Sequence, residues 1–464
     1  MTFSSVTTSG NKGLGGLIGF LRYNTTGAVH TVKNSTNSGN ITTSASAGGE
    51  TDIAGLIGYA YKNILIENCT NSGAISTTGT ATKPRVAGIT GVAHTSVNIK
   101  GCTNSGAITN ASSNQTPYIG GISGYGNTAT IKDCINQGEV KLTNTGGAPA
   151  VGGVLGQDAG SMTIEGCRNT GNVTATKSTG TFWIGGISAV STTTSELTSC
   201  VNEGTVKASQ NGQHSYVGGI VGQGHGIITS CENATKGVVI VEHTSANGKY
   251  ALAGGIVGKS NSTVTIQNCT NNGTVKALVN TTNKLTGAGG IIGQPQQLVT
   301  LTNNTNKGDV YAENKHTSTA RVYAGGIWAT DVEGTSNAGA ASVTGNVNYG
   351  EVKVVATKAA GSNDAYTSRS AAAAGGLFGF IGRTPVAKVA ADNINYGVVS
   401  ATNAGAATTA GALAGASQLA TWSAKVGKNV TVNGVAISTP IDAAWLCPSA
   451  EAALTATAVD APAN

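Results

Sequence analysis

Seven of the eight cysteines stand in one short phrase that the chain repeats. The phrase reads "NCTNSGAI" at 68–75 and "GCTNSGAI" at 101–108, and later copies include "DCINQGEV" and "NCTNNGTV". Its cysteines are Cys69, Cys102, Cys134, Cys167, Cys200, Cys231 and Cys269. Thiols at such regular spacing could bind a metal, pair as disulfides, or pack as small buried side chains.

The spacing favours the last of these three possibilities. Zinc sites use closely spaced pairs such as C-x-x-C, and the sequence has none. Disulfides between neighbouring repeats have a compatible Cα separation, but seven is an odd number and side chains in one column point the same way. We therefore predict a column of buried free thiols, because buried cysteine packs as a small hydrophobic residue. Partial disulfide formation is the alternative.

Carboxylates and histidines are the next groups that could do chemistry. A β-helix lyase or glycosidase needs two carboxylates about 5–10 Å apart on neighbouring repeats. Asp309 and Glu351 take one position in adjacent repeats, but no histidine, lysine or arginine shares that position, and the six histidines are scattered. We expect solvated turn carboxylates, no metal and no cofactor.

Aromatic residues gather in the last repeats, beside the longest insertion, at residues 330–370. Trp328 and Phe378 take one position in adjacent repeats, and Tyr349 and Tyr396 take another. By strand alternation we expect these rings to point outward, where rings at fixed spacing can form a platform for sugars or a protein partner. The alternative is that they pack against the C-terminal tail.

Two alternating phrases define the elements that must position these residues. The second phrase is Gly-Gly-aliphatic-x-Gly, as in "GGLIG" at 15–19, "GGVLG" at 152–156 and "GGIVG" at 218–222. Its copies are mostly 32 to 36 residues apart, and eleven are readable. Helical repeats share this period, but many Gly, Thr, Val and Ile oppose helix and favour strand. The sequence predicts an all-β, parallel β-solenoid of about eleven or twelve coils over residues 1–415, followed by an irregular capping tail over 416–464.

Stacked coils turn the phrases into columns. The position occupied by Ile66, Ile99 and Ile131 is predicted to point inward, and the next, with Lys132 and Glu165, outward. The asparagines of the phrase include Asn71, Asn104, Asn136, Asn169 and Asn202. Amides carry both a donor and an acceptor, so we expect them to hydrogen-bond along the stack. The glycine two residues later is expected to allow a turn with positive φ.

Composition excludes several classes of partner. Charged residues make up 10% of the chain, against roughly 25% in a typical globular protein. The net charge of +6 is taken as spread along the chain, and no basic run is present, so nucleic-acid binding is disfavoured. The sequence has no apolar run of about 18 residues, so it predicts no membrane-spanning helix. The first residues lack the pattern of a signal peptide, so any export segment is expected to be absent from this sequence.

The two phrases resemble GLUG-motif repeats over roughly residues 10–415. "GGIVG", "GGLIG" and "GGLFG" alternate with "NCTNSGAI" and "NCTNNGTV" as they do in that family, although Ala189 and Ala329 replace the final glycine. The family occurs in exported, adhesin-like proteins of Gram-negative gut bacteria. The resemblance implies an extracellular or cell-surface location and no catalytic residues. Because exported proteins can form disulfides, it also keeps disulfide formation in the cysteine column as an alternative.

Two classes of function remain open. The first is a non-catalytic surface rod that acts in adhesion or as a scaffold and binds glycans, host or partner proteins, or its own kind. Its tentative ligand-binding residues are Trp328, Tyr349, Phe378 and Tyr396. The second is a carbohydrate-active β-helix enzyme, which requires a cleft with two carboxylates in register. The scarcity of such pairs favours the first.

Overall fold

The computed structural model describes most of the chain. The described residues are 2–3, 12–22, 27–45, 50–80, 82–112, 116–145, 147–178, 180–210, 213–244, 249–282, 284–316, 321–331, 342–357, 372–381, 389–403, 408–417, 423–437, 443–447 and 455–460. In this part the chain is almost entirely β-strand, with one α-helix, α1 (Ala443–Leu446), of four residues. The predicted parallel β-solenoid is confirmed, with about ten turns and a period near 34 residues.

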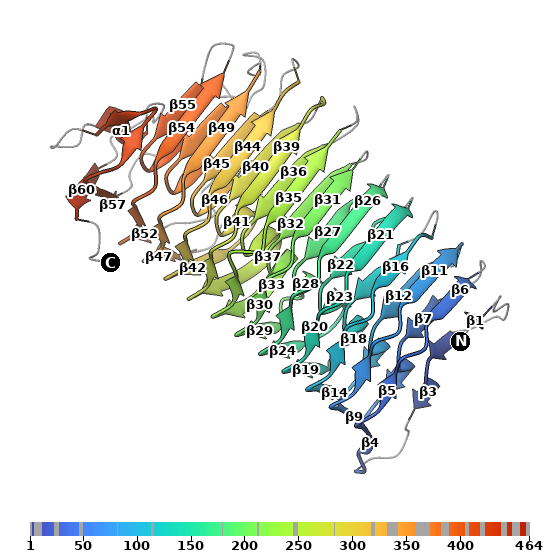
Figure 1. Cartoon of the computed structure of the whole chain (residues 1–464). Helices are drawn as coiled ribbons and strands as arrows, with labels where there is room; N and C mark the ends of the chain where they lie inside the picture. The colour runs from blue at the N-terminus through green and yellow to red at the C-terminus, as the bar shows by residue number, and fades with distance from the viewer. Residues whose placement is uncertain are drawn as a thin grey trace. The chain divides into compact units, whose positions relative to one another are not determined.

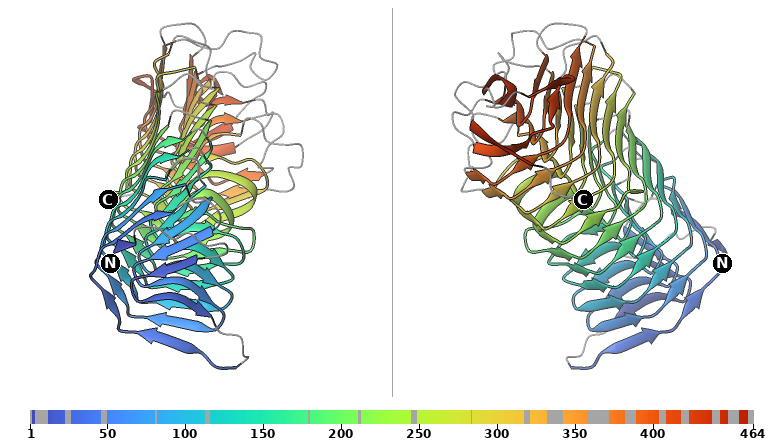
Figure 2. Two further views of the ribbon diagram at one scale, coloured as in Figure 1. Left: turned by 90° about the vertical axis from the view of Figure 1, so that its right-hand side faces the viewer. Right: turned by 60° about the vertical axis from the view of Figure 1, so that its left-hand side comes forward.

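The chain divides into two compact units. Unit 1 comprises residues 1–212 and 220–227, and unit 2 comprises residues 213–219 and 228–464. Each coil contributes to four parallel sheets, which we number in chain order. Sheet 1 precedes the Gly-Gly turn, sheet 2 follows it, sheet 3 carries the ladder asparagine, and sheet 4 completes the coil. Within each unit, the strands of a sheet lie side by side in chain order, as Figures 1 and 2 show.

The strands of unit 1 have these bounds. Sheet 1 contains β2 (Lys12–Gly15), β7 (Glu50–Ala54), β12 (Lys83–Ala87), β17 (Tyr118–Gly120), β22 (Ala150–Gly152) and β27 (Phe182–Gly185). Sheet 2 contains β3 (Ile18–Arg22), β4 (His30–Lys33), β8 (Ile57–Tyr61), β9 (Ile64–Glu67), β13 (Thr90–His94), β14 (Val97–Lys100), β18 (Ser123–Asn127), β19 (Thr130–Lys132), β23 (Leu155–Asp158), β24 (Thr163–Glu165), β28 (Ser188–Val190) and β29 (Glu196–Thr198). Sheet 3 contains β5 (Thr36–Asn37), β10 (Thr70–Asn71), β15 (Thr103–Asn104), β20 (Ile135–Asn136), β25 (Arg168–Asn169) and β30 (Val201–Asn202). Sheet 4 contains β1 (Thr2–Phe3), β6 (Ile41–Ala45), β11 (Ile75–Gly79), β16 (Ile108–Asn110), β21 (Val140–Thr145), β26 (Val173–Ser178) and β31 (Val206–Gln210).

Unit 2 repeats the arrangement. Sheet 1 contains β32 (His214–Gly218), β36 (Tyr250–Gly254), β40 (Leu285–Gly289), β45 (Arg321–Gly325), β50 (Ala372–Gly375) and β55 (Thr408–Gly411). Sheet 2 contains β37 (Val257–Gln267), β41 (Ile292–Gln294), β42 (Val299–Thr302), β46 (Trp328–Thr330), β47 (Ser342–Thr344), β51 (Phe378–Ile381), β52 (Val389–Ala391) and β56 (Ala414–Ser417). Sheet 3 contains β34 (Glu232–Asn233), β38 (Thr270–Asn271), β43 (Thr305–Asn306), β48 (Val347–Asn348), β53 (Ile394–Asn395), β57 (Ser423–Gly427) and β60 (Thr455–Val459). Sheet 4 contains β35 (Val239–His243), β39 (Val275–Val279), β44 (Val310–Asn314), β49 (Val352–Ala356), β54 (Val399–Asn403), β58 (Thr431–Val432) and β59 (Val435–Ala436).

The inward column is confirmed. Ile66, Ile99 and Ile131 are completely buried and lie in register on β9, β14 and β19. Their neighbours point outward, and Lys132 forms the predicted ion pair with Glu165 at 2.8 Å. Both of these charged side chains are partly exposed, so the pair contributes only about 0–1 kcal/mol to stability. The aliphatic column is therefore the stabilising element of this side.

The two phrases contact each other inside the coil. Gly88, which follows Ala87 and takes the second glycine position of its phrase, lies against the ladder asparagine of the same coil, since a Cβ at Gly88 would be 2.3 Å from Asn104 Cγ. The glycine of the cysteine phrase is equally confined, because a Cβ at Gly106 would be 2.1 Å from the carbonyl oxygen of Gly73. The Gly-Gly phrase thus packs across the coil interior onto the asparagine corner.

The prediction of positive φ at this glycine is wrong, since Gly73 and Gly106 are not among the residues with positive φ. The left-handed residue is the one before the cysteine, as at Asn68 (φ 51°), Gly101 (φ 60°) and Asp133 (φ 52°). Asn, Asp and Gly are the residues that adopt this conformation at least cost. The glycine after the asparagine is required by close backbone contact between coils, not by its dihedral angle.

The coil stack continues past the predicted boundary at residue 415. β57 pairs in parallel with β53, and β60 pairs in parallel with β57. The short helix α1 lies between β57 and β60 in the chain, and the backbone N–H of Ala412 donates to the carbonyl oxygen of Trp445 at 2.7 Å. Chain segments near the C-terminus therefore cover strand edges of unit 2, as a cap does. Among the described helices, none is long and apolar enough to span a membrane.

Candidate functional site

The cysteine column is buried, as predicted, and its thiols form no disulfides. All seven cysteines of the column and Cys447 are buried and unpaired by disulfides. In unit 1, the backbone N–H of Cys102 donates to Cys134 Sγ at 3.4 Å, and the Cys102 thiol lies 3.5 Å from the carbonyl oxygen of Ile66. The hydrogen bond that the Cys69 thiol donates to Cys102, together with burial, raises the pKa of Cys69 well above its usual value. Such a thiol stays protonated and is a poor nucleophile.

The asparagine ladder is confirmed in both units. In unit 1, each Nδ2 donates to the Oδ1 of the next coil at 2.8 Å, through Asn37, Asn71, Asn104, Asn136, Asn169 and Asn202. In unit 2, Asn233, Asn271, Asn306, Asn348 and Asn395 form the same chain at 2.7 to 2.8 Å. Each Nδ2 also donates to the carbonyl oxygen of the glycine in its own corner, as in Asn104 to Gly106 at 3.0 Å. The ladders hold the scaffold and are not a site.

Two of the four predicted ligand-binding aromatic residues are not at the surface. Trp328 is 1% exposed and Phe378 is 2% exposed, and their rings pack 4.2 Å apart. The Trp328 indole N–H donates to the carbonyl oxygen of Phe380 at 3.2 Å. The expectation that these rings point outward is therefore wrong.

Close packing of two strands explains this burial. β51 packs against β45 through the face that carries Phe378, because the ring of Phe380, two residues further along, stacks on that of Tyr323 with centroids 5.2 Å apart. Both residues after the Gly-Gly pair are consequently enclosed, and Leu377 and Phe378 are both buried. Simple alternation fails where a strand is covered on both faces. Of the insertion beside these residues, 332–341 and 358–371 lie outside the described residues.

The two tyrosines behave differently from that pair. Tyr349 is 40% exposed, and its ring stacks on that of Tyr396 with centroids 5.1 Å apart. The Tyr396 hydroxyl donates to the carbonyl oxygen of Asp460 at 3.3 Å, and a Cβ at Gly427 would be 2.6 Å from the Tyr396 ring. Tyr396 therefore packs against the C-terminal segments, which was the alternative expectation. Stacked rings also cover each other's faces, so Tyr349 and Tyr396 do not form a flat double platform.

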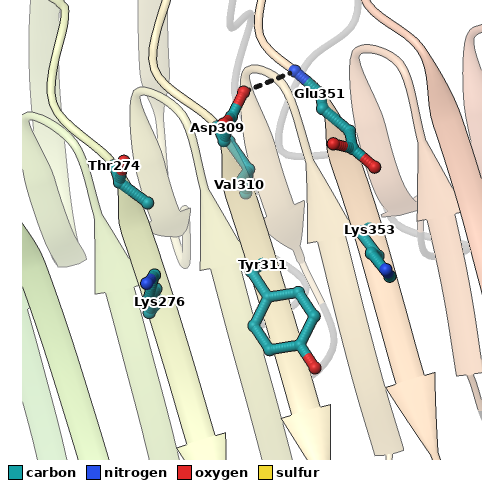
Figure 3. A pocket seen from close by; sticks show the side chains of 7 residues that line it. All are labelled: Thr274, Lys276, Asp309, Val310, Tyr311, Glu351 and Lys353. Carbon is teal, nitrogen blue, oxygen red and sulfur yellow. Dashed lines mark hydrogen bonds between the residues drawn. The ribbon is translucent and has the colours of Figure 1, made fainter.

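A shallow pocket lies on the outer face of sheet 4 in unit 2. It has a volume of about 420 Å³, which falls within the usual range for small-ligand sites. Its lining residues are Thr274, Lys276, Asp309, Val310, Tyr311, Glu351 and Lys353. Figure 3 shows them on three neighbouring strands.

Strand alternation and register place these side chains. Lys276, Tyr311 and Lys353 form one row across β39, β44 and β49, because they are register partners. Asp309 and Glu351 precede Tyr311 and Lys353 by two residues and so point to the same face. Burial, followed by the neighbouring Glu313 carboxylate, raises the pKa of Tyr311 to about 12. The phenol is therefore neutral at physiological pH, and its O–H donates to the Glu313 carboxylate.

Sequence reasoning found the two carboxylates and missed the lysines. It compared only residues at the same position as Asp309 and Glu351, whereas the lysines stand two residues further along the strand. The signal was present, since the pattern acid-x-Lys occurs at Glu351 and Lys353. Searching each column together with the column two residues away would have identified this row.

Asp309 has a structural role that is shared with other coils. Its Oδ1 accepts the backbone N–H of Glu351 at 3.1 Å. In unit 1, Asn40 Oδ1 accepts the N–H of Ala74 at 2.9 Å and Asn172 Oδ1 accepts the N–H of Thr205 at 3.1 Å. Asp309 therefore accepts a backbone N–H of the next coil, as the side-chain amides of Asn40 and Asn172 do at the same position. The presence of one of the two carboxylates of the pocket is therefore explained by a structural hydrogen bond and does not require a catalytic role.

No metal site is visible in the part of the chain that the structure describes. No group of three or more His, Cys, Asp and Glu side chains there is arranged to hold an ion. The pocket offers two ammonium groups, two carboxylates and a phenol, which suits a ligand rich in hydroxyl groups. Charges of both signs also make it a poor site for a simple anion or cation.

Comparison with known proteins adds no relative. No protein-family model matches the chain, and neither a curated protein nor a solved structure matches it. The resemblance to GLUG-motif repeats therefore rests on the two sequence phrases alone.

Proposed function

We propose that this protein is a non-catalytic extracellular scaffold that binds a glycan on the outer face of sheet 4 in unit 2. The observation that carries the proposal is the row Lys276–Tyr311–Lys353 beside Asp309 and Glu351 in one open pocket. Ammonium groups donate hydrogen bonds and carboxylates accept them, so neighbouring sugar hydroxyls can satisfy both. The edge of the Tyr311 ring offers an apolar contact to the sugar.

The same arrangement argues against the enzyme alternative. A glycosidase needs two carboxylates with separate acid and base roles, but Asp309 already accepts a backbone N–H in place of an asparagine. Location at the cell surface and a role in adhesion follow from the GLUG resemblance and stay part of the proposal. Self-association and protein ligands are the other partners that such a scaffold would accept.

Binding to immobilised glycans tests this proposal. We expect the purified chain to bind a neutral glycan, and the double variant Lys276→Gln, Lys353→Gln to lose at least about tenfold in affinity, since each charged hydrogen bond is worth roughly 1.5–3 kcal/mol in place. Lys141→Gln is the matched control, because Lys141 has the same position on sheet 4 of unit 1. Equal binding by the double variant and the control would contradict the proposed site.

The enzyme alternative needs its own measurement. Asp309→Asn preserves the hydrogen bond that Asn40 and Asn172 make, so the variant should fold normally. If the parent chain releases new reducing ends or unsaturated sugars from a polysaccharide and Asp309→Asn does not, the protein is an enzyme. We expect no such release from either protein.

A further inference from the structure

The charged side chains of the unit 2 pocket are sorted by sign into two rows. Lys276 and Lys353 stand on either side of Tyr311 in one row, because the three residues are register partners on β39, β44 and β49. Asp309 and Glu351 form the other row, since they precede Tyr311 and Lys353 by two residues in the chain. Figure 3 shows the lysine row across the three strands and the carboxylates above it. The pocket therefore has a positive side and a negative side.

Strand geometry fixes the dimensions of this arrangement. Neighbouring strands are about 4.8 Å apart, so the backbones that carry the two lysines are about 10 Å apart, with the tyrosine between them. A strand rises about 3.3 Å per residue, so the two rows are about 7 Å apart at the backbone. A short oligosaccharide can therefore reach both rows at once.

The protein does not neutralise these charges itself. In the part of the chain that the structure describes, Lys276, Lys353 and Glu351 form no ion pair. Elsewhere the same fold pairs opposite charges readily, since Lys132 and Glu165 share one column in unit 1 and lie 2.8 Å apart. The offset of two residues between the rows keeps the charges of the pocket separate. They remain available to a ligand.

A further carboxylate on this face, that of Glu313, does not cancel the positive row. It accepts the hydroxyl of Tyr311 and lies 3.5 Å from the ammonium group of Lys315. Its side chain is only 15% exposed. The register partners of Glu313 on the neighbouring strands are Leu278 and Val355, which carry no charge. The two lysines of the pocket are therefore opposed only by the carboxylate row.

We propose that this pocket binds a zwitterionic glycan, which carries a carboxylate on one side and an ammonium group on the other. This inference rests on the proposed function, because it names the class of glycan that the pocket takes. The ligand carboxylate lies between Lys276 and Lys353. The ligand ammonium group lies on Glu351 and Asp309. Hydrogen bonds between charged groups are roughly twice as strong as those between neutral groups, so a ligand with both charges gains more from the pocket than an uncharged sugar.

Separate rows also disfavour ligands of a single sign. A purely anionic sugar that contacts the lysines brings its negative charge close to Asp309 and Glu351. A purely cationic sugar that contacts the carboxylates meets the lysines in the same way. Like charges placed side by side at a binding site lower affinity and reject wrong partners. The pocket is therefore selective for the charge pattern of the ligand and not for its net charge.

Four oligosaccharides with one common backbone test this selectivity. The first is a tetrasaccharide of alternating glucosamine and glucuronate with free amino groups, which carries both charges. Its N-acetylated form keeps only the carboxylates, its methyl ester keeps only the ammonium groups, and the form with both changes is uncharged. In isothermal titration of the whole chain, we expect the doubly charged form to bind at least about tenfold more tightly than each of the others. This difference should shrink as salt is raised.

Variants assign each ligand charge to its row. The double variant Lys276→Gln, Lys353→Gln should weaken binding of the doubly charged form at least about tenfold and leave the methyl ester unaffected. Glu351→Gln should also weaken binding of the doubly charged form but leave the N-acetylated form unaffected. A misfolded protein would lose all forms alike, so these opposite patterns exclude misfolding as the cause. Lys141→Gln, the matched control from unit 1, should bind all four forms like the parent.

The outcomes separate this inference from the proposed function. If the uncharged form binds as tightly as the doubly charged form and the lysine variants weaken both, the pocket binds glycans and the zwitterion inference is wrong. If the N-acetylated form or the methyl ester binds as tightly as the doubly charged form, the inference is also wrong, since one charge suffices. If none of the four forms binds while an immobilised neutral glycan does, only the inference fails. If no glycan binds at all, both proposals fail.

Discussion

Cys269 and Asn304 occupy the same position in consecutive coils of unit 2, and the backbone N–H of Cys269 donates to Asn304 Oδ1 at 3.0 Å. One coil earlier, the N–H of Cys231 donates to Cys269 Sγ at 3.4 Å. The donors match as well, since the Cys269 thiol lies 3.5 Å from the carbonyl oxygen of Ile228 and Asn304 Nδ2 lies 2.8 Å from that of Ile266. A thiol and an amide therefore fill one hydrogen-bonding role in this column.

Replacing Cys269 tests this equivalence. Cys269→Asn should extend the asparagine run and change the free energy of unfolding by less than about 1 kcal/mol. Cys269→Ala should destabilise unit 2 by about 1–3 kcal/mol, because it leaves the buried N–H of Cys231 without an acceptor. Urea unfolding followed by circular dichroism measures both. An asparagine variant as unstable as the alanine variant would show that the two residues are not interchangeable.

The thiols themselves are expected to be reduced and protected. All eight cysteines are buried and form no disulfides, so a small thiol reagent should label almost none in the native protein and all eight in denaturant without reductant. Mass spectrometry counts the labels. Two or fewer labels in denaturant would mean that the column is crosslinked.

A middle rung of the asparagine ladder should matter more than its first rung. Asn136→Ala removes the acceptor of Asn104 and the donor to Asn169, which lie at 2.8 Å on either side. We expect a loss of roughly 2–4 kcal/mol, because two buried amides each lose a partner. Asn37→Ala is the matched control, since Asn37 has one ladder neighbour among the described residues and is 8% exposed. Equal losses in thermal unfolding would mean that the ladder is not a chain of coupled bonds.

The aromatic residues of unit 2 should separate into structural and surface roles. Trp328→Ala should destabilise the protein by about 3–5 kcal/mol, the usual cost of removing a buried aromatic ring. Tyr349→Ala should change stability by less than about 1 kcal/mol, because this ring is 40% exposed. Denaturant midpoints report both values. A Tyr349 variant that unfolds as early as the Trp328 variant would show that the tyrosine stack supports the fold.

The buried carboxyl of Asp52 predicts a pH dependence. Burial raises the pKa of Asp52 from an ordinary value of 3.8 to about 8. Between these values the folded protein holds a proton that the unfolded chain has released, so this group lowers stability progressively as pH rises from about 4 to about 8. Asp52→Asn should therefore match the parent near pH 4 and unfold at a higher temperature than the parent at pH 8.

Contact with the nearby Arg85 would remove this pH dependence if it keeps the Asp52 carboxylate ionised. Arg85 Nε lies 3.4 Å from Asp52 Oδ1, and neither atom has a hydrogen-bond partner in the described structure. If this contact keeps Asp52 ionised, the difference in melting temperature between Asp52→Asn and the parent will not change with pH. Differential scanning calorimetry across this pH range distinguishes the two cases.

Much of the fold was predictable because the repeat imposes columns. Ile66 and Ile99 point inward and Asn71 and Asn104 bond along the stack, as one period of the sequence implies. Trp328 and Phe378 were misplaced because alternation indicates which side a residue takes, not whether a second strand covers that side. The packing of β51 on β45 depends on contacts between sheets, which the period does not contain.

The surface features were harder to predict for a related reason. The pocket combines Asp309 with Lys276 of another coil. The two residues differ in both column and coil, so comparison within one column does not find the pair.

The asparagine ladders align whole coils, whatever the number of residues in each coil. Asn104 and Asn136 are 32 positions apart and Asn348 and Asn395 are 47 apart, yet the hydrogen bond from Nδ2 to Oδ1 is 2.8 Å long in both cases. Unequal recombination between two copies of the phrase would remove or duplicate one whole coil and rejoin both columns with the same contacts. Loops between the phrases can likewise lengthen without breaking either column. A lineage carrying this architecture can therefore change its length in steps of one coil and diversify its loops while the core sequence stays the same.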